Sequence, residues 1–252
     1  MASIKELAKQ LGGDQEAAYR AYKALEQIVT RASAPGNDRE RAAAAADLAA
    51  ELHARGEPKK DKKGNETPGD LIHSSRTRNK IARLLSYVAG AGQVPALTKL
   101  LGDLEVREMA RFALDRDASA EATEALIKAL DEQVGPEFRV GVVNALSKRT
   151  GANVLKALKQ AAQDEDRPVR IAAVEALSGF PDPAHDPLIA KATQADCTRC
   201  RARAHKARVR LAETLSKAGK KAAARRIYNA IQSSDADDPQ KKAAEIGLKA
   251  IG

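Results

Sequence analysis

Apolar residues recur every three or four positions through most of the chain. One stretch shows the spacing at Met109, Phe112 and Ala113 and then, after a break, at Leu126, Ile127 and Leu130. This period predicts amphipathic helices. No segment alternates polar and apolar residues long enough to predict a strand. The pattern therefore predicts an all-α protein.

Four stretches share one pattern at nearly regular intervals. They are "TRNKIARLL" from Thr77, "VREMARFAL" from Val106, "FRVGVVNAL" from Phe138 and "VRIAAVEAL" from Val169. Each has an arginine at its second position, and these arginines are 29, 32 and 31 residues apart. Each stretch is followed by a second amphipathic segment, such as "VPALTKLL" or "EATEALIKAL". A fixed period of about thirty residues is typical of a solenoid built from helix pairs.

The pattern D-x-x-VR-x-x-A-x-x-AL, followed by a second helix, resembles HEAT-like repeats of the short bacterial type, which are also found in phycobilin lyase subunits. The resemblance covers about Arg76 to Asp196, and more narrowly it is similar to repeat proteins common in planctomycete-type bacteria. It implies a right-handed α-solenoid of helix pairs with helical caps. It implies little about function, because such repeats serve many partners.

Four segments are expected along the chain. Residues 1–54 form an N-terminal helical cap, residues 55–70 a flexible polar loop, residues 71–196 the HEAT-like repeats, and residues 197–252 a long basic helix with further C-terminal helices. In the last segment, Gly219, Ala224 and Tyr228 are spaced as in a single tetratricopeptide (TPR) unit. A solenoid needs such an end to cover its last apolar face.

Positive charge is concentrated in one part of the chain. The net charge of the 252 residues is +9. The segment from Lys191 to Ala230 holds twelve Lys or Arg against Asp196 and Glu213, and the rest of the chain holds 31 basic against 32 acidic residues. A basic segment of this kind favours an anionic partner.

The first residues, "MASIKELAKQLGG", lack the apolar core of a signal peptide. Nowhere do about eighteen apolar residues run together, as a membrane span would require. We expect a cytoplasmic protein without a membrane segment, or an exported one if a targeting segment was removed from this end.

The repeat arginines are Arg78, Arg107, Arg139 and Arg170. Asp103 and Asp166 each stand four residues before one of them, a spacing that suits an ion pair between a turn and the helix it begins. We therefore expect an internal ladder of Asp–Arg pairs, and this reading is favoured over a site for an anionic ligand.

The stretch "CTRCRARAHKARVRL", Cys197 to Leu211, holds both cysteines of the chain. A zinc site usually needs four ligands, and beyond Cys197 and Cys200 only His205 and the distant His185 are at hand, so zinc is not favoured. A redox CxxC pair normally follows a strand and opens a helix, and no strand is expected here. No metal and no cofactor are predicted.

A packing role accounts for the cysteines more simply. Residues at intervals of 4, 3, 4 and 4 form the stripe that a helix buries, and here they are Cys200, Ala204, Ala207, Leu211 and Leu215. Cysteine in such a stripe behaves as a small apolar residue.

The opposite side of that helix is basic. It carries Arg199, Arg203, Lys206 and Arg210, flanked by Arg201 and Arg208, and it can be widened by Lys220, Lys221, Arg225 and Arg226. We take Arg199, Arg203, Lys206, Arg210, Lys220, Lys221 and Arg225 as the candidate partner-binding residues. The alternative is a solvated face that only keeps the protein soluble.

The favoured function is a non-catalytic scaffold that presents a helical-repeat surface to a protein partner. That surface is either the basic stripe or the concave face formed by second helices such as "EATEALIKAL". The alternative is a protein that binds the phosphate backbone of nucleic acid without regard to sequence, although four Tyr, three Phe and no Trp offer few platforms for stacking bases. No nucleophile elbow, phosphate-binding loop or zinc-protease motif is present. An enzyme, such as a lyase subunit or a relative of DNA glycosylases, is a minor alternative that rests on fold analogy.

Overall fold

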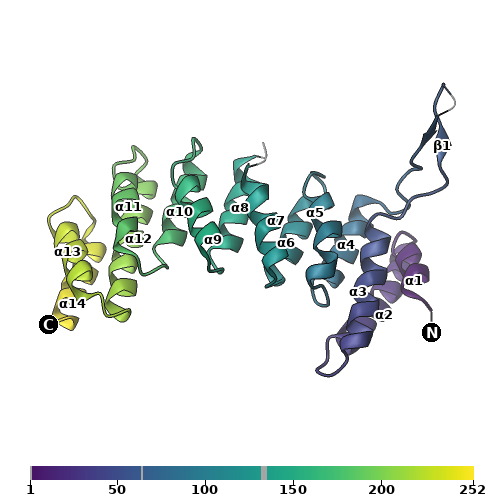
Figure 1. The fold of residues 1–252 in the computed structure, drawn as a ribbon, viewed down its shortest axis with the longest axis horizontal. Coiled ribbons are helices and arrows are strands. Elements are labelled where there is room, and N and C mark those ends of the chain that lie inside the picture. Colours follow the sequence, from purple (N-terminus) through teal and green to yellow (C-terminus); the bar gives the residue numbers. More distant parts are fainter. Residues whose placement is uncertain (1, 64, 132–134) are drawn as a thin grey trace. The chain divides into compact units, whose positions relative to one another are not determined.

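The structure is a computed structural model that describes residues 2–63, 65–131 and 135–252. Within these ranges it holds fourteen α-helices, two 3-10 helices and one small sheet (Figure 1). The predicted all-α repeat solenoid is confirmed. The chain divides into two compact units, Met1–Leu126 and Ile127–Gly252, here named the N-terminal unit and the C-terminal unit. Among the described residues, no helix is both long and apolar enough to cross a bilayer.

The N-terminal unit begins with three helices and continues with helix pairs. The helices are α1 (Ile4–Gln10), α2 (Gln15–Ala32), α3 (Asp38–Leu52), α4 (Ser75–Leu85), α5 (Val94–Leu100), α6 (Arg107–Arg116) and the first part of α7 (Ala120–Asp131). A 3-10 turn, η1 (Ala91–Gln93), precedes α5. Side chains of Ser3 and Asp14 cap the starts of α1 and α2 by accepting backbone N–H groups. Helix α4 packs on both α3 and α6.

A hairpin stands between α3 and α4, where the sequence predicts only a polar loop and no strand. Strands β1 (Lys59–Lys60) and β2 (Glu66–Thr67) pair in antiparallel fashion. Asp61 Oδ1 accepts the backbone N–H groups of Lys63 and Asn65 at 2.8 and 2.9 Å and so closes the turn. The expectation of no strand was wrong here, because backbone pairing and an Asp-stabilised turn form a hairpin without any apolar alternation.

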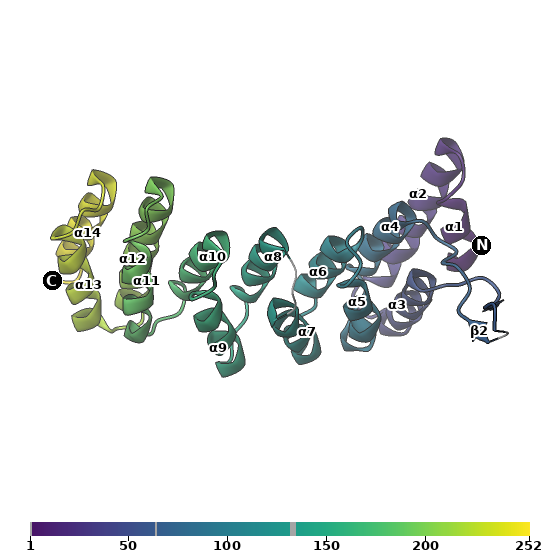
Figure 2. The same ribbon diagram turned by 90° about the horizontal axis from the view of Figure 1, so that it is seen from above.

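The C-terminal unit holds the end of α7 and the helices from α8 onward. These are α8 (Pro136–Leu146), α9 (Ala152–Ala161), α10 (Arg167–Leu177), α11 (Asp186–Ala192), α12 (Thr198–Lys217), α13 (Lys221–Gln232) and α14 (Asp238–Ala250), with a 3-10 turn η2 (Pro183–His185) before α11. Helix α10 packs on α8 and on α12, and the three lie side by side in both ribbon views (Figures 1 and 2).

Small residues allow these helices to approach closely. The Ala-Leu pairs that end the repeat pattern are buried in the structure: Ala113 and Leu114, Ala145 and Leu146, Ala176 and Leu177. An alanine at a helix contact occupies little volume, so backbones can pack near each other and leave no void. The low aromatic content of the sequence is thus consistent with a core of thin, closely packed helices.

The repeat arginines make internal contacts, but not with the partners expected from their spacing. Arg78 donates to Asp103 Oδ2 at 2.7 Å and to the carbonyl oxygen of Leu52 at 3.1 Å. The hydrogen bond from Arg78 lowers the pKa of the Asp103 carboxyl. Arg139 in turn pairs with both Asp164 and Asp166.

Each of these two arginines therefore reaches forward to an aspartate of the following repeat. The expected pair of Asp166 with Arg170 is wrong, since Arg170 donates to the carbonyl oxygens of Asp164 and Glu165 at 2.6 and 2.7 Å. Asp103, which was expected to pair with Arg107, instead accepts a hydrogen bond from Arg78 of the preceding repeat. The spacing of four residues predicted the right residue types. The residues that pair, however, are 25 or more positions apart and belong to consecutive repeats, which no local pattern reveals.

The last two helices cover the end of the C-terminal unit. Gly219 has a φ of +77° in the turn between α12 and α13, a conformation that glycine adopts without strain. Tyr228 of α13 is buried, and Gly247 of α14 lies directly on its ring, where a Cβ atom would come within 2.3 Å of Cζ. Glycine at this position lets α14 pack on α13. The resemblance of this pair to a TPR unit stays a prediction.

Candidate functional site

Helix α12 begins at the cysteine pair and extends for 20 residues. Arg201, in its first turn, donates to the carbonyl oxygens of Ala195 and Asp196 at 3.0 and 3.2 Å. These acceptors are six and five residues earlier in the chain, as are the acceptors of Arg170 in α10. Arg201 also follows Arg170 by 31 residues. Helix α12 therefore starts another repeat, and Arg201 is its repeat arginine.

Arg208 faces inward, although the sequence placed it beside an outward basic stripe. Its Nε and Nη2 donate to the two carboxylate oxygens of Asp186 in α11, at 2.7 and 3.0 Å. The Arg208 side chain is only 10% exposed. Its predicted place beside an exposed stripe was wrong, because Asp186 of the preceding repeat draws the guanidinium to the α11 side of the helix.

Arg203 is also paired. It forms a bidentate contact with Glu175 of α10, with N···O distances of 2.7 and 2.6 Å. The hydrogen bonds that Arg203 donates to Glu175 raise the pKa of the guanidinium further above its already high ordinary value. Arg203 therefore ties α12 to α10 and, with its charge balanced, adds little to a surface that could attract an anion.

The remaining cations on this side of α12 form a straight row. Arg199, Lys206, Arg210 and Lys217 are exposed, and no hydrogen bond or ion pair of their side chains is found among the described residues. At 100° per residue they lie within about 40° of one another around the helix axis. We call these four residues the α12 row. Glu213 is exposed on the same line and is the acidic member of this face.

Lys217 was missed as a candidate residue. It follows Arg210 by seven residues, which is two helical turns, and this spacing was already visible in the sequence. At the other end of the row, Arg199 stands one position before Cys200. From Arg199 to Lys217 the row extends for about 27 Å at the helical rise.

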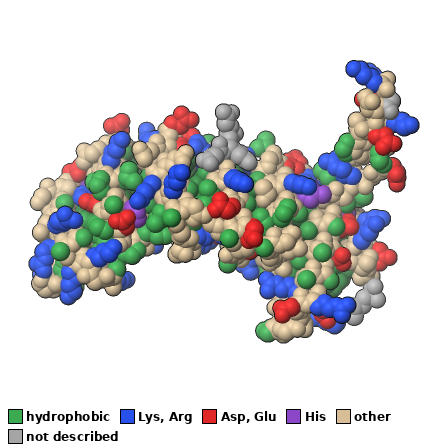
Figure 3. All heavy atoms as spheres, in the orientation of Figure 1, with side chains coloured by type: hydrophobic (Ala, Val, Ile, Leu, Met, Phe, Trp, Pro, Cys, Tyr) green, Lys and Arg blue, Asp and Glu red, His purple; other side chains and the backbone are tan. Residues whose placement is uncertain are grey.

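The candidate residues beyond α12 differ in their contacts. Lys220 donates from Nζ to the carbonyl oxygen of Pro181 at 2.7 Å, and Arg225 donates to the carbonyl oxygen of Gly252. Lys221 is exposed at the start of α13. The carbonyl oxygen of Pro181 carries no formal charge, so Lys220 is not in an ion pair as Arg203 and Arg208 are. Lys and Arg side chains gather over α13 and α14 at the left end of Figure 3.

The two histidines that were weighed as metal ligands, His185 and His205, are both buried. His205 Nε2 lies 3.3 Å from Asp235 Oδ1, and His185 Nε2 lies 3.7 Å from Asp182 Oδ2. Burial lowers the pKa of both imidazoles, although the nearby carboxylates act in the opposite direction. Among the residues that the structure describes, no three His, Cys, Asp or Glu side chains are grouped to hold a metal ion.

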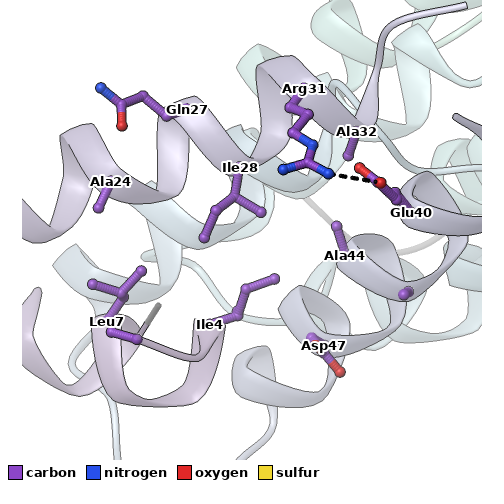
Figure 4. A pocket seen from close by; sticks show the side chains of 12 residues that line it. Ile4, Leu7, Ala24, Gln27, Ile28, Arg31, Ala32, Glu40, Ala44 and Asp47 are labelled. Carbon is purple, nitrogen blue, oxygen red and sulfur yellow. Dashed lines mark hydrogen bonds and ion pairs between the residues drawn. The ribbon is translucent and has the colours of Figure 1, made fainter.

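The N-terminal unit contains an apolar hollow between α1, α2 and α3, with a volume of about 660 Å³ (Figure 4). Ile4, Leu7 and Ile28 point into it, and an ion pair of 3.0 Å between Arg31 and Glu40 crosses one edge. Its walls offer few polar groups to orient a small molecule or to act as acid and base. The hollow was not anticipated from the sequence.

Comparison with known families is consistent with the repeat geometry. The model for HEAT repeats matches residues 94–178 and, in an overlapping second match, residues 123–207. Residues 94–207 therefore consist of HEAT-like repeats. The second match ends inside α12, in agreement with the position of Arg201 as a repeat arginine. No curated protein sequence matches this HEAT-like protein.

Several solved structures are similar to it. A chain in the structure of Kap95p with RanGDP has a TM-score of 0.50 and 15% identity, over 99% of this chain and 41% of that chain. A chain in the complex of CpcE and CpcF of phycocyanin lyase from Nostoc sp. PCC7120 has a TM-score of 0.46 and 18% identity, over 100% of this chain and 96% of that chain. The archaeal HEAT-like repeats protein from Thermococcus onnurineus NA1 has a TM-score of 0.35 and 12% identity, over 98% of this chain and 86% of that chain. The first of these supports the solenoid fold.

Proposed function

We propose that this HEAT-like protein is a non-catalytic scaffold that binds an acidic protein partner through the basic surface of α12 and α13. HEAT repeats commonly serve as protein-interaction scaffolds, and the finer statement rests on one observation. After Arg203 and Arg208 are paired with carboxylates, the α12 row still presents four exposed cations, and Lys221 adds a fifth at the start of α13.

The physical basis of the proposed contact is charge held on a rigid support. The row belongs to a helix of 20 residues that Arg203 and Arg208 fasten to the two preceding helices. Because the support is already ordered, binding costs little backbone entropy. A row of cations also steers an acidic surface toward the site, and this attraction weakens as salt is added.

A protein partner is favoured over nucleic acid by the aromatic residues of the C-terminal unit. Tyr228 and Phe138 are buried, and Phe180 packs edge-on against the His185 ring, with 6.5 Å between the two ring centroids. None of these three aromatic residues lies on α12 or α14, so none offers a platform there on which bases could stack. Contact with a duplex backbone alone requires no such platform and remains an outcome of the test.

The test compares two triple variants of equal net charge. Arg199→Glu, Lys206→Glu and Arg210→Glu reverse the α12 row, while Lys5→Glu, Lys62→Glu and Lys63→Glu reverse exposed lysines of the N-terminal unit. Both variants and the unchanged protein are used as bait in cross-linking pull-downs from the source cells. A partner held by the α12 row is lost only from the first variant, and equal retention by all three baits would contradict the proposal.

Nucleic acid is tested with the same proteins. Fluorescence anisotropy is measured with duplex DNA and with structured RNA over a salt series. If the α12 row contacts a phosphate backbone, affinity falls steeply with salt and is lost in the first variant. Such a result would replace the protein partner by nucleic acid, whereas absence of binding near physiological salt removes the nucleic-acid alternative.

A further inference from the structure

The two cysteines lie together at the start of α12. Cys197 is the N-cap residue, with an extended backbone at φ −80° and ψ 115°, and its Sγ accepts the backbone N–H of Cys200 at 3.2 Å. Both thiols are free and both residues are half-buried, so each is within reach of a small reagent. This arrangement places one sulfur across the first helical turn from the other, as the N-cap and N3 side chains of a capping box are placed.

The surroundings of the two thiols differ in a way that suits different roles. Hydrogen bonds from Cys200 hold the pKa of the Cys197 thiol below its ordinary value, and the Arg167 guanidinium of the preceding repeat lowers it further. Burial raises the pKa of the Cys200 thiol, and its hydrogen bond with Cys197 acts in the same direction. The start of a helix also favours negative charge on the first of the two sulfurs.

We propose that Cys197 and Cys200 form a reversible dithiol–disulfide site, in which Cys197 attacks and Cys200 resolves. The sequence disfavoured a redox pair because no strand precedes it. The reactivity of a CxxC pair, however, depends on the helix start and on a neighbouring cation, and both are present here without a strand: Cys197 caps α12, and the Arg167 guanidinium acts on its thiol.

The oxidant in this proposal is a low-molecular-weight disulfide such as oxidised glutathione. The Cys197 thiolate attacks one sulfur of that disulfide, its S–S bond breaks, and one thiolate leaves and takes up a proton. Cys200 then loses its proton, and its thiolate attacks the Cys197 sulfur of the mixed disulfide, which expels the second small thiolate. The sum is one protein dithiol and one small disulfide giving one protein disulfide and two small thiols.

This site is separate from the α12 row, although Arg199 stands between the two cysteines. Disulfide formation would replace the Cys197 thiol, whose pKa the Arg167 guanidinium helps to lower, by an uncharged disulfide sulfur. The proposal does not depend on the proposed partner, since the chemistry needs only the two thiols, the guanidinium and a small disulfide.

The experiment uses the full-length reduced protein, oxidised glutathione and intact-mass spectrometry. The unchanged protein should lose the mass of two hydrogens and regain it with reductant. Cys200→Ser should stop at a stable glutathione adduct on Cys197, because the resolving thiol is missing. Cys197→Ser should react slowly or not at all. Serine is nearly isosteric and is a good N-cap residue, so both variants keep the helix start.

A second measurement addresses the asymmetry. With limiting iodoacetamide near neutral pH, Cys197 should be alkylated faster than Cys200, since the thiolate is the reacting form and the surroundings shift the pKa of the two thiols in opposite directions. Arg167→Gln should slow the alkylation of Cys197, and Arg167→Lys should restore most of the rate. Two thiols that stay reduced in oxidised glutathione, or that are alkylated at equal rates, would overturn the proposal.

Discussion

Arg208 and Arg210 allow two matched substitutions on one helix. Arg208→Met removes the bidentate contact with Asp186, in which the side chains are 10% and 23% exposed. Arg210→Met removes the same charge from an exposed position that has no carboxylate partner among the described residues. The two variants therefore have the same composition and differ in the contact that is lost.

The expected cost of Arg208→Met lies between two limits. Breaking a buried ion pair costs about 3–5 kcal/mol, because one charge is left without its partner, and an exposed pair contributes about 0.2–1 kcal/mol. Asp186 retains some exposure and lies in the first turn of α11, where the helix N-terminus stabilises a negative charge. We therefore expect about 2 kcal/mol for Arg208→Met and less than about 0.5 kcal/mol for Arg210→Met.

The assay is urea unfolding at constant pH, followed by circular dichroism, with the free energy of unfolding compared between variants. The double variant Arg208→Met with Asp186→Leu should recover much of the loss, since no unpaired carboxylate remains. Equal costs for Arg208→Met and Arg210→Met would refute the division of these arginines into paired and exposed groups.

Three further predictions concern packing, protonation and the repeat contacts. Gly247→Ala should lower the free energy of unfolding by about 1–3 kcal/mol, because its Cβ would overlap the buried tyrosine ring; Gly102→Ala, with open space around it, is the control in thermal unfolding. Folding lowers the pKa of His185 and His205 below the ordinary 6.5, so the unfolded chain binds more protons as pH falls. Stability should therefore decrease as pH drops through that value, and unfolding curves that do not change between pH about 7.5 and about 5.5 would contradict this. Arg139→Lys should destabilise the C-terminal unit by about 1–2 kcal/mol in urea, since an ammonium cannot bridge both carboxylates as the guanidinium fork does; a smaller cost than for Arg210→Met would contradict it.

The repeating helices could be predicted from the sequence, because apolar periodicity and the arginine spacing are local properties. The buried stripe of α12 was predicted as well: Ala204, Ala207, Leu211 and Leu215 are buried, and only Cys200 is half-exposed. The period of 31 residues would also have identified Arg201 as a repeat arginine, had it been extended by one step.

The partners of the α12 arginines could not be predicted in this way. Arg203 and Arg208 look alike in the sequence, yet their carboxylates come from 28 and 22 residues earlier, in two different helices. Which side of α12 meets α10 and which meets α11 depends on how the helices pack. Only the packed structure separates the paired arginines from Arg199 and Arg210.

The forward contacts of the repeat arginines change what counts as one module of this protein. A segment cut just before the aspartate of the D-x-x-VR pattern would contain an aspartate whose arginine was left behind, as Asp103 would be without Arg78 and Asp166 without Arg139. Arg139 with Asp164 and Asp166 shows that the self-sufficient piece runs from the first helix of one repeat into the opening turn of the next. A duplication or a graft that respects this boundary would keep these ion pairs, whereas one that is cut just before the aspartate would leave an unpaired ion at the joint.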